Sequence, residues 1–313
     1  MRMTVDRRRV LALALGAAAF GALPAATRAA RRETAQGQAQ SLGGGITLVS
    51  GVGANVLALS SPDGSLLVDT GAAAHLGDLR AQLGKLPGKG RVAQVINTHW
   101  HRDQTGGNEA FGKAGAAILA HVKTRQHIAV DLWQPDAQAY LRALPKPAWP
   151  TKTFYGTESL DFAGEHVECG YLLEAHTDGD VYVRFTRANV LAVGDVLAAP
   201  GADPELDWFG GGWLGGRVDA LAELLKISDA NTRVVPSQGP VVTREALQAE
   251  HDVLAPLLDR LAGLMRKGFT TDDMIASNVL ETTGRRWNDG AKFLYSAHKG
   301  LWAHHNTLSH DIV

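Results

Sequence analysis

Two histidines and an aspartate share one short loop of the sequence. His99, His101 and Asp103 follow the apolar run 92–96, and a glycine pair closes the loop. Two histidines two residues apart can direct both imidazoles at one metal ion, while the aspartate can add an oxygen ligand or orient a bound water. The spacing therefore predicts a metal site at the end of this strand.

Three more polar positions follow apolar segments further along the chain. They are His176, Asp195 and Gln238, each close to the end of a run that is typical of a strand. Imidazole and carboxylate groups suit zinc, whereas the amide of a glutamine is a weak, neutral ligand. His176 and Asp195 are therefore further residues at strand ends that could bind a metal.

The elements that must position these residues begin with strand patterns. Short apolar runs at 46–49, 55–59 and 65–69 predict a β-meander, because turn residues separate them. Leucines at helical spacing then predict a helix over 75–86, and glycines end it before the strand at 92–96.

The second half of the chain shows the same kinds of strand and helix pattern. Its strands are predicted at 171–173, 181–185, 190–193 and 233–235, with a helix over 218–227 and helical patterns from Arg244 onward. Two β-rich halves, each closed by helices, indicate a layered α/β sandwich.

With its motifs in this order, the chain resembles the metallo-β-lactamase superfamily over residues 44–247. The match comprises the turn 68–71, the histidine loop and the later polar positions. The resemblance implies a four-layer αββα fold with up to two metal ions, usually zinc. It also implies the metal ligands, which are His99, His101 and His176 for the first metal, with Asp103 and Asp195 for the second.

Two positions depart from the family pattern, and both belong to the second metal. Gln104 and Gln238 stand where histidines are expected. Because amide oxygens bind a borderline-soft cation weakly, we expect one tightly held ion. Asp103 and Asp195 would then lie close together without a shared cation, which predicts a raised pKa for one of them.

These residues predict a mono-zinc hydrolase acting on a small-molecule substrate. Hydroxide generated at zinc would attack the carbonyl of a lactam, lactone, ester or thioester. Asp103 would orient or deprotonate the water, and Gln104 or Gln238 would donate a hydrogen bond to the oxyanion. The family resemblance does not choose among these substrates.

Two other functions fit the same residues. One is a catalytically silent protein that keeps the fold and binds a ligand. The other is a mononuclear iron oxygenase, because His99, His176 and Asp195 form a two-histidine, one-carboxylate set that suits iron. Metal identity separates iron from zinc, and a turnover panel separates the hydrolase from the silent protein.

The first thirty residues resemble a signal peptide. Arg7-Arg8-Arg9 precede the apolar run 10–20, and small residues follow it, as in a twin-arginine signal. We therefore expect an exported, periplasmic protein with no stable membrane anchoring after cleavage. The predicted boundaries are a signal peptide at 1–30, a mature N-terminal segment at 31–43, the metallo-β-lactamase-type domain at 44–247, and a helical extension packed on that domain at 248–313.

Charge, cysteine usage and one aromatic segment limit the function further. Thirty-one basic and thirty-two acidic residues leave a net charge of -1, so we expect no nucleic-acid partner. Cys169 is the only cysteine, which excludes an intrachain disulfide and indicates a buried thiol. The segment 207–216 sets three aromatics among glycines and is predicted to form a wall of the site.

Overall fold

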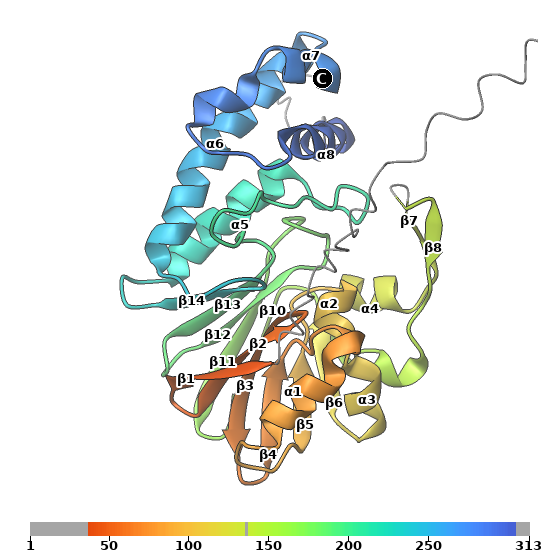
Figure 1. Cartoon of the computed structure of the whole chain (residues 1–313), viewed down its shortest axis with the longest axis vertical. Coiled ribbons are helices and arrows are strands. Elements are labelled where there is room, and N and C mark those ends of the chain that lie inside the picture. Colours follow the sequence, from red (N-terminus) through yellow and green to blue (C-terminus); the bar gives the residue numbers. More distant parts are fainter. Residues whose placement is uncertain (1–36, 135–136, 305–313) are drawn as a thin grey trace, which may run out of the picture. The chain divides into compact units, whose positions relative to one another are not determined.

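The β-meander at the start of the mature chain extends through parallel strands into a seven-stranded sheet (Figure 1). Strands β1 to β4 pair antiparallel, whereas β4, β5, β6 and β9 pair parallel. The computed structural model describes residues 37–134 and 137–304. The strands of this sheet are β1 (Gln38–Gly43), β2 (Ile46–Val52), β3 (Ala54–Ser61), β4 (Gly64–Val68), β5 (Val92–Ile96), β6 (Ala117–His121) and β9 (Lys152–Phe154).

A second sheet of five strands faces the first. Its strands follow chain order and pair antiparallel, except that β13 and β14 run parallel because the helix α5 (Leu214–Ile227) connects them. They are β10 (Thr157–Phe162), β11 (Glu165–Tyr171), β12 (Val181–Phe185), β13 (Val190–Gly194) and β14 (Arg233–Pro236). A small hairpin, β7 (Leu132–Gln134) with β8 (Ala139–Leu141), stands apart from both sheets.

Helices cover the outer face of each sheet, which gives the four predicted layers. Leu79, Leu83 and Phe111 pack on the outer face of the first sheet. Leu221 and Leu254 pack with Leu191 of the second sheet and with the last helices. The helices are η1 (Ala73–His75), α1 (Leu76–Leu83), α2 (Arg102–Thr105), α3 (Asn108–Lys113), α4 (Val122–Ile128), η2 (Lys146–Ala148), α5 (Leu214–Ile227), α6 (Arg244–Arg266), α7 (Thr271–Ala276), η3 (Val279–Thr283) and α8 (Gly290–Ala303).

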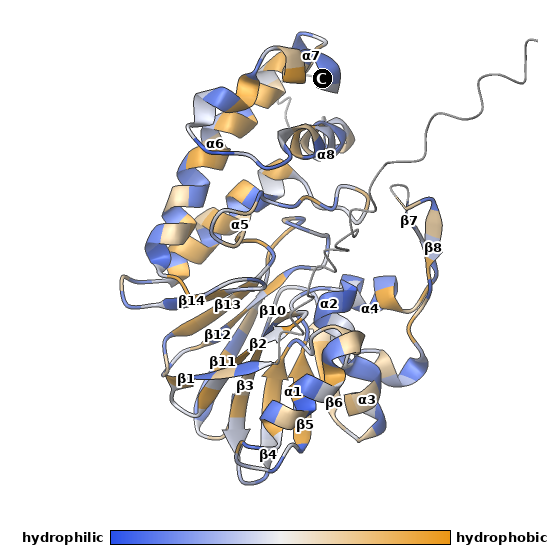
Figure 2. Cartoon of the chain, viewed as in Figure 1, coloured by the Kyte–Doolittle hydropathy of each residue, from blue (hydrophilic) through white to orange (hydrophobic). Residues whose placement is uncertain are grey.

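The central core lies between the two sheets. Leu57 and Leu66 of the first sheet share one buried cluster with Val183 and Phe185 of the second. Cys169 is 1% exposed in the same cluster. Figure 2 shows hydrophobic residues concentrated along the strands. The αββα fold predicted from the resemblance is thereby confirmed, and the metal-capable residues lie on loops at strand ends.

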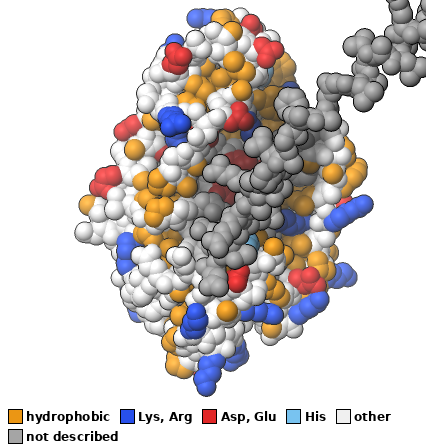
Figure 3. All heavy atoms as spheres, viewed as in Figure 1, with side chains coloured by type: hydrophobic (Ala, Val, Ile, Leu, Met, Phe, Trp, Pro, Cys, Tyr) orange, Lys and Arg blue, Asp and Glu red, His pale blue; other side chains and the backbone are white. Residues whose placement is uncertain are grey.

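The C-terminal helices join the fold through α5. The predicted boundary at residue 247 falls inside α6, and α6, α7 and α8 share one buried cluster with α5 and the second sheet. The predicted signal peptide at 1–30 lies outside the described residues. Within the described part of the chain, no helix is long and apolar enough to cross a membrane. Figure 3 shows basic and acidic side chains interspersed among apolar ones on the visible described surface.

Candidate metal centre

The loop that carries the first two histidines is held by Asp69, which directly follows β4. Asp69 adopts a left-handed backbone conformation, with φ of 63°. Its carboxylate accepts hydrogen bonds from the backbone nitrogen of Thr98 (2.8 Å) and from the Thr98 hydroxyl (2.7 Å). Burial raises the pKa of Asp69 to about 7 against the lowering effects of His99 and Thr98. These contacts fix the backbone that leads into His99.

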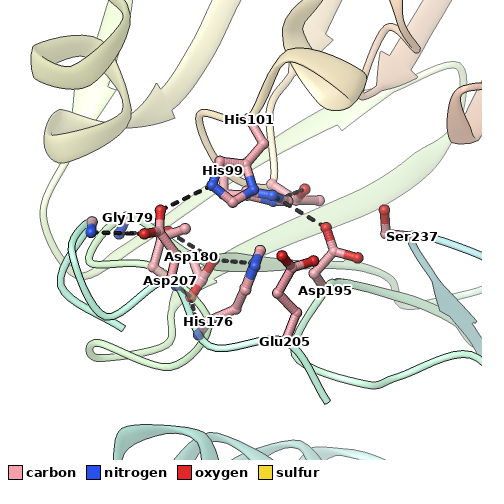
Figure 4. Close-up of polar contacts among 12 residues, drawn as sticks. His99, His101, His176, Gly179, Asp180, Asp195, Glu205, Asp207 and Ser237 are labelled. Atoms are coloured by element: carbon pink, nitrogen blue, oxygen red, sulfur yellow. Dashed lines mark hydrogen bonds and ion pairs between the residues drawn. The ribbon is translucent and has the colours of Figure 1, made fainter. Parts of the chain in front are cut away.

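Three imidazoles converge at this edge of the sandwich (Figure 4). The ring centroids of His99, His101 and His176 lie 4.8 to 4.9 Å apart, edge to face. One potential ligand atom from each histidine and one from Asp195 all lie within 4.8 Å of one another. Because the histidines come from the β5–α2 and β11–β12 loops and Asp195 follows β13, both sheets supply the group.

His176 has the environment of a metal ligand. Its side chain is 1% exposed, and neither ring nitrogen has a hydrogen-bond partner among the described residues. Burial, reinforced by the positive charges of His101 and His99, holds the pKa of His176 well below its usual range despite the opposing charge of Asp195. A neutral buried imidazole with a free lone pair is the form that binds a metal ion. The residues present therefore fit a metal.

The loop that presents His176 is held by Asp180. One carboxylate oxygen accepts hydrogen bonds of 2.6 Å from the backbone nitrogens of His176 and Thr177. The other accepts a hydrogen bond of 3.0 Å from the Thr177 hydroxyl. Asp180 therefore sets the approach of His176 to the site in the way that Asp69 sets that of His99.

Asp195 lies beside His99. Its Oδ2 is 3.3 Å from Nε2 of His99. Burial opposes a charge on either group. The adjacent Asp195 nevertheless raises the pKa of His99 to about 9, and the histidines hold the pKa of Asp195 well below its usual range. The lowered pKa of Asp195 is the opposite of the raised pKa that the sequence predicts for either Asp103 or Asp195.

His101 has a carboxylate partner that sequence reasoning missed as a site residue. Asp207 Oδ2 lies 3.0 Å from Nε2 of His101, and its backbone nitrogen donates to the carbonyl of His176 at 3.0 Å. Burial would raise the pKa of Asp207, but the contact with His101 outweighs it and lowers the pKa. The contact occupies Nε2 and leaves Nδ1 of His101 for a metal. A carboxylate in this position orients the ring and strengthens the ligand.

Gln104 connects the two predicted second-metal carboxylates. Its Nε2 lies 3.2 Å from Asp103 Oδ2, 3.1 Å from Asp195 Oδ2 and 2.6 Å from the hydroxyl of Ser237. The two aspartates thus share a neutral amide donor. Asp103 is not one of the four residues in the histidine group.

The other glutamine lies away from this contact. Gln238 is exposed, and its amide nitrogen donates to the carbonyl of Gly53 at 2.6 Å. Its neighbour Ser237, which is 4% exposed, makes the contact with Gln104 instead. Sequence reasoning missed Ser237, because a serine next to a candidate ligand carries no signal of its own.

A cavity of about 140 Å³ opens beside His101. The predicted aromatic wall contributes Asp207, Trp208 and Phe209 to it. The remaining lining comes from His101, Gln134, Glu205, Leu206, Lys292 and Ser296. The start of the segment 207–216 therefore lines a cavity beside His101, as predicted for a wall of the site.

The chain belongs to the metallo-β-lactamase superfamily. Its sequence matches the family model described as "Metallo-beta-lactamase superfamily" over residues 49–298. No curated protein matches the sequence significantly. Membership and the histidine–aspartate group together support a metal-dependent hydrolase.

Solved structures share the fold at low sequence identity. A metallo-beta-lactamase from Pontibacter korlensis is 21% identical with a TM-score of 0.56, and the match covers 70% of this chain and 99% of that one. A metallo-beta-lactamase from Hirschia baltica is 21% identical with a TM-score of 0.52, and the match covers 68% and 94%. The sec-alkylsulfatase Pisa1 from Pseudomonas sp. is 18% identical with a TM-score of 0.68; the match covers 84% of this chain and half of Pisa1.

Proposed function

We propose that the protein is a hydrolase that uses one zinc ion held by His99, His101 and His176. The observation that carries this proposal is the convergence of three imidazoles, one of which, the buried His176 ring, has no hydrogen-bond partner among the described residues. Three histidines are a common catalytic zinc set, because they leave one coordination position open. The third imidazole also favours zinc over the iron alternative, which uses only two histidines.

The zinc ion and the side chains around it would each have a role in the reaction. A zinc ion bound there would lower the pKa of a water ligand to about 7 and polarise a carbonyl oxygen. The Asp195 carboxylate lies 3.3 Å from Nε2 of His99, and the histidines favour its charged form, so it can balance positive charge in the imidazole group. Asp207 keeps the ring of His101 oriented.

The structure suggests a different role for Gln104 from the one the sequence predicts. Three acceptor atoms surround its amide nitrogen, so its two hydrogens already have partners. We assign it to holding Asp103 and Asp195 together rather than to the oxyanion. Gln238 makes one contact through its amide nitrogen, with Gly53, and so keeps a hydrogen for a substrate.

The proposed substrate is a small molecule with the acyl carbonyl of a lactam, lactone, ester or thioester. The cavity beside His101 is too small for a macromolecule and has aromatic and charged walls. The names of the two β-lactamases and the alkylsulfatase that share this fold indicate small-molecule substrates. This supports a small-molecule substrate for the present protein.

Elemental analysis of tag-free protein after dialysis against a mild chelator tests the proposal. Wild type should retain about one zinc ion per chain, because only the three-histidine set is complete. His176→Ala should lose it together with hydrolysis of an ester, thioester and lactam panel. His75→Ala removes an exposed histidine outside the group and should retain both.

Each other outcome leads to a different function. Two tightly held ions in wild type would refute the one-metal site. Iron in place of zinc would favour the oxygenase, and zinc without turnover on the panel would favour the silent binding protein.

We further propose export by the twin-arginine route, on the basis of Arg7-Arg8-Arg9 before the apolar run. Replacing Arg7 and Arg8 by lysine should leave the precursor in the cytoplasm, as measured by cell fractionation. Normal export of this variant would indicate the general secretory route.

A further inference from the structure

Helix α4 packs against the loop between β11 and β12, which presents His176. The buried hydroxyl of Thr124 donates to the carbonyl of Gly179 at 3.2 Å. His127 donates from Nε2 to a carboxylate oxygen of Asp178 at 2.7 Å. Gly179 lies so close to the helix that a Cβ atom there would stand 2.9 Å from the Thr124 hydroxyl oxygen. α4 therefore holds the turn that follows His176.

His127 also contacts the other histidine loop, through Trp100. The two rings stack, with centroids 4.8 Å apart and planes 20° from parallel. Trp100 is 2% exposed, and it contacts the ring of His101 edge to face, with 4.4 Å between centroids. Because Trp100 stands between His99 and His101 in the sequence, a contact that fixes its ring also restrains the backbone of both histidines.

The two loops that His127 joins come from different sheets. The loop with His99 and His101 follows β5 of the first sheet, and the loop with His176 follows β11 of the second. A three-histidine site needs all three rings around one point, so the separation of the loops decides how well a metal fits. The imidazole of His127 reaches the first loop with its flat face and the second with Nε2.

The contact between His127 and Asp178 is partly sheltered from water. The side chain of His127 is 18% exposed and that of Asp178 15%, so solvent weakens their hydrogen bond less than it would on the open surface. Lys123 also reaches Asp178, at 3.6 Å, but its side chain is 47% exposed and its contact is correspondingly weaker. His127 is thus the main side chain through which α4 holds Asp178.

We propose that His127 is a positioning residue, which fixes the two histidine loops relative to each other and so preorganises the three imidazoles for a metal ion. His127 is not one of the four residues of the metal group, so it acts through Trp100 and Asp178. The effect on metal affinity rests on the proposed zinc site. The connection between the loops is a property of the metal-free chain and can be measured there.

Hydrogen–deuterium exchange of the metal-free full chain tests the connection. His127→Ala removes both contacts and should speed amide exchange in 97–105 and 176–180 by about tenfold, the size expected for loss of one hydrogen bond to a charged group. His127→Phe keeps a ring on Trp100 without a donor, so only 176–180 should exchange faster. His127→Gln keeps a donor without the ring, so only 97–105 should exchange faster.

His166→Ala is the matched control, because His166 also pairs with an aspartate, Asp161, at 2.9 Å on the second sheet. It should leave both segments at the wild-type exchange rate. Zinc affinity in chelator competition is the second readout, and His127→Ala should lower it by about tenfold. The visible spectrum of the cobalt(II)-substituted protein should shift in His127→Ala as well, because this spectrum reports the ligand geometry rather than the stability of the fold.

Two results would overturn the connection between the loops. They are wild-type exchange in both segments of His127→Ala, and an equal effect of His166→Ala. Faster exchange together with wild-type zinc affinity and a wild-type cobalt spectrum would overturn the positioning role. Absence of metal binding by the wild-type protein would refute the proposed zinc site, whereas the exchange rates would still decide whether His127 joins the loops.

Discussion

Gln104→Leu removes the amide that Asp103 and Asp195 share. The side chain is fully buried, and its Nε2 lies 3.2 and 3.1 Å from the two carboxylates. A hydrogen bond to a charged group contributes about 1.5 to 3 kcal/mol, and leucine cannot replace it. We therefore expect metal-stripped Gln104→Leu to be less stable by roughly 2 to 4 kcal/mol, which at about 2 to 4 °C per kcal/mol lowers Tm by roughly 4 to 16 °C.

Thermal unfolding followed by circular dichroism measures this difference. The matched control is Gln248→Leu, because Gln248 donates to the exposed Asp252 at 2.7 Å on the surface of α6. That variant should stay within about 0.5 kcal/mol of wild type. If Gln104→Leu melts at the wild-type temperature or higher, the amide does not hold the carboxylates together and our reasoning about Gln104 is wrong.

Three further predictions concern the metal site and the buried cysteine. Replacing Gln104 by histidine should raise the metal content above one ion per chain by elemental analysis, because an imidazole then stands between Asp103 and Asp195; an unchanged content would contradict this. Asp207→Asn should weaken zinc affinity by about ten- to a hundredfold in chelator competition, through loss of the carboxylate on His101. Burial raises the pKa of the Cys169 thiol to about 12, so iodoacetamide at pH 8 should label Cys169 only after denaturation, and labelling of native protein would show that the thiol is accessible.

The fold was predictable where strands and helices are long enough to show their period. The meander and α5 follow the predicted runs within a few residues. The pattern predicts no element between 97 and 165, where the structure has short helices and strands. α2 spans four residues and β9 three, so neither completes the periods that make a pattern visible.

The site was predictable for residues whose type and local spacing suit a metal. His99 and His101 share a loop, and His176 and Asp195 follow strand-like runs. Asp207 and Ser237 could not be found in this way, because their contacts join residues 106 and 133 positions apart. Only the packing of the two sheets brings such partners together.

The amide contact of Gln104 also bears on how such a site can change during evolution. Glutamine and histidine codons differ at the third base alone, so a single base change converts this donor into an imidazole. Asp103 and Asp195 already lie on either side of this position, and while the glutamine is present they accept hydrogen bonds from its amide. A lineage could therefore gain or lose a second metal by small genetic steps without passing through an intermediate with two unbalanced, partly buried charges.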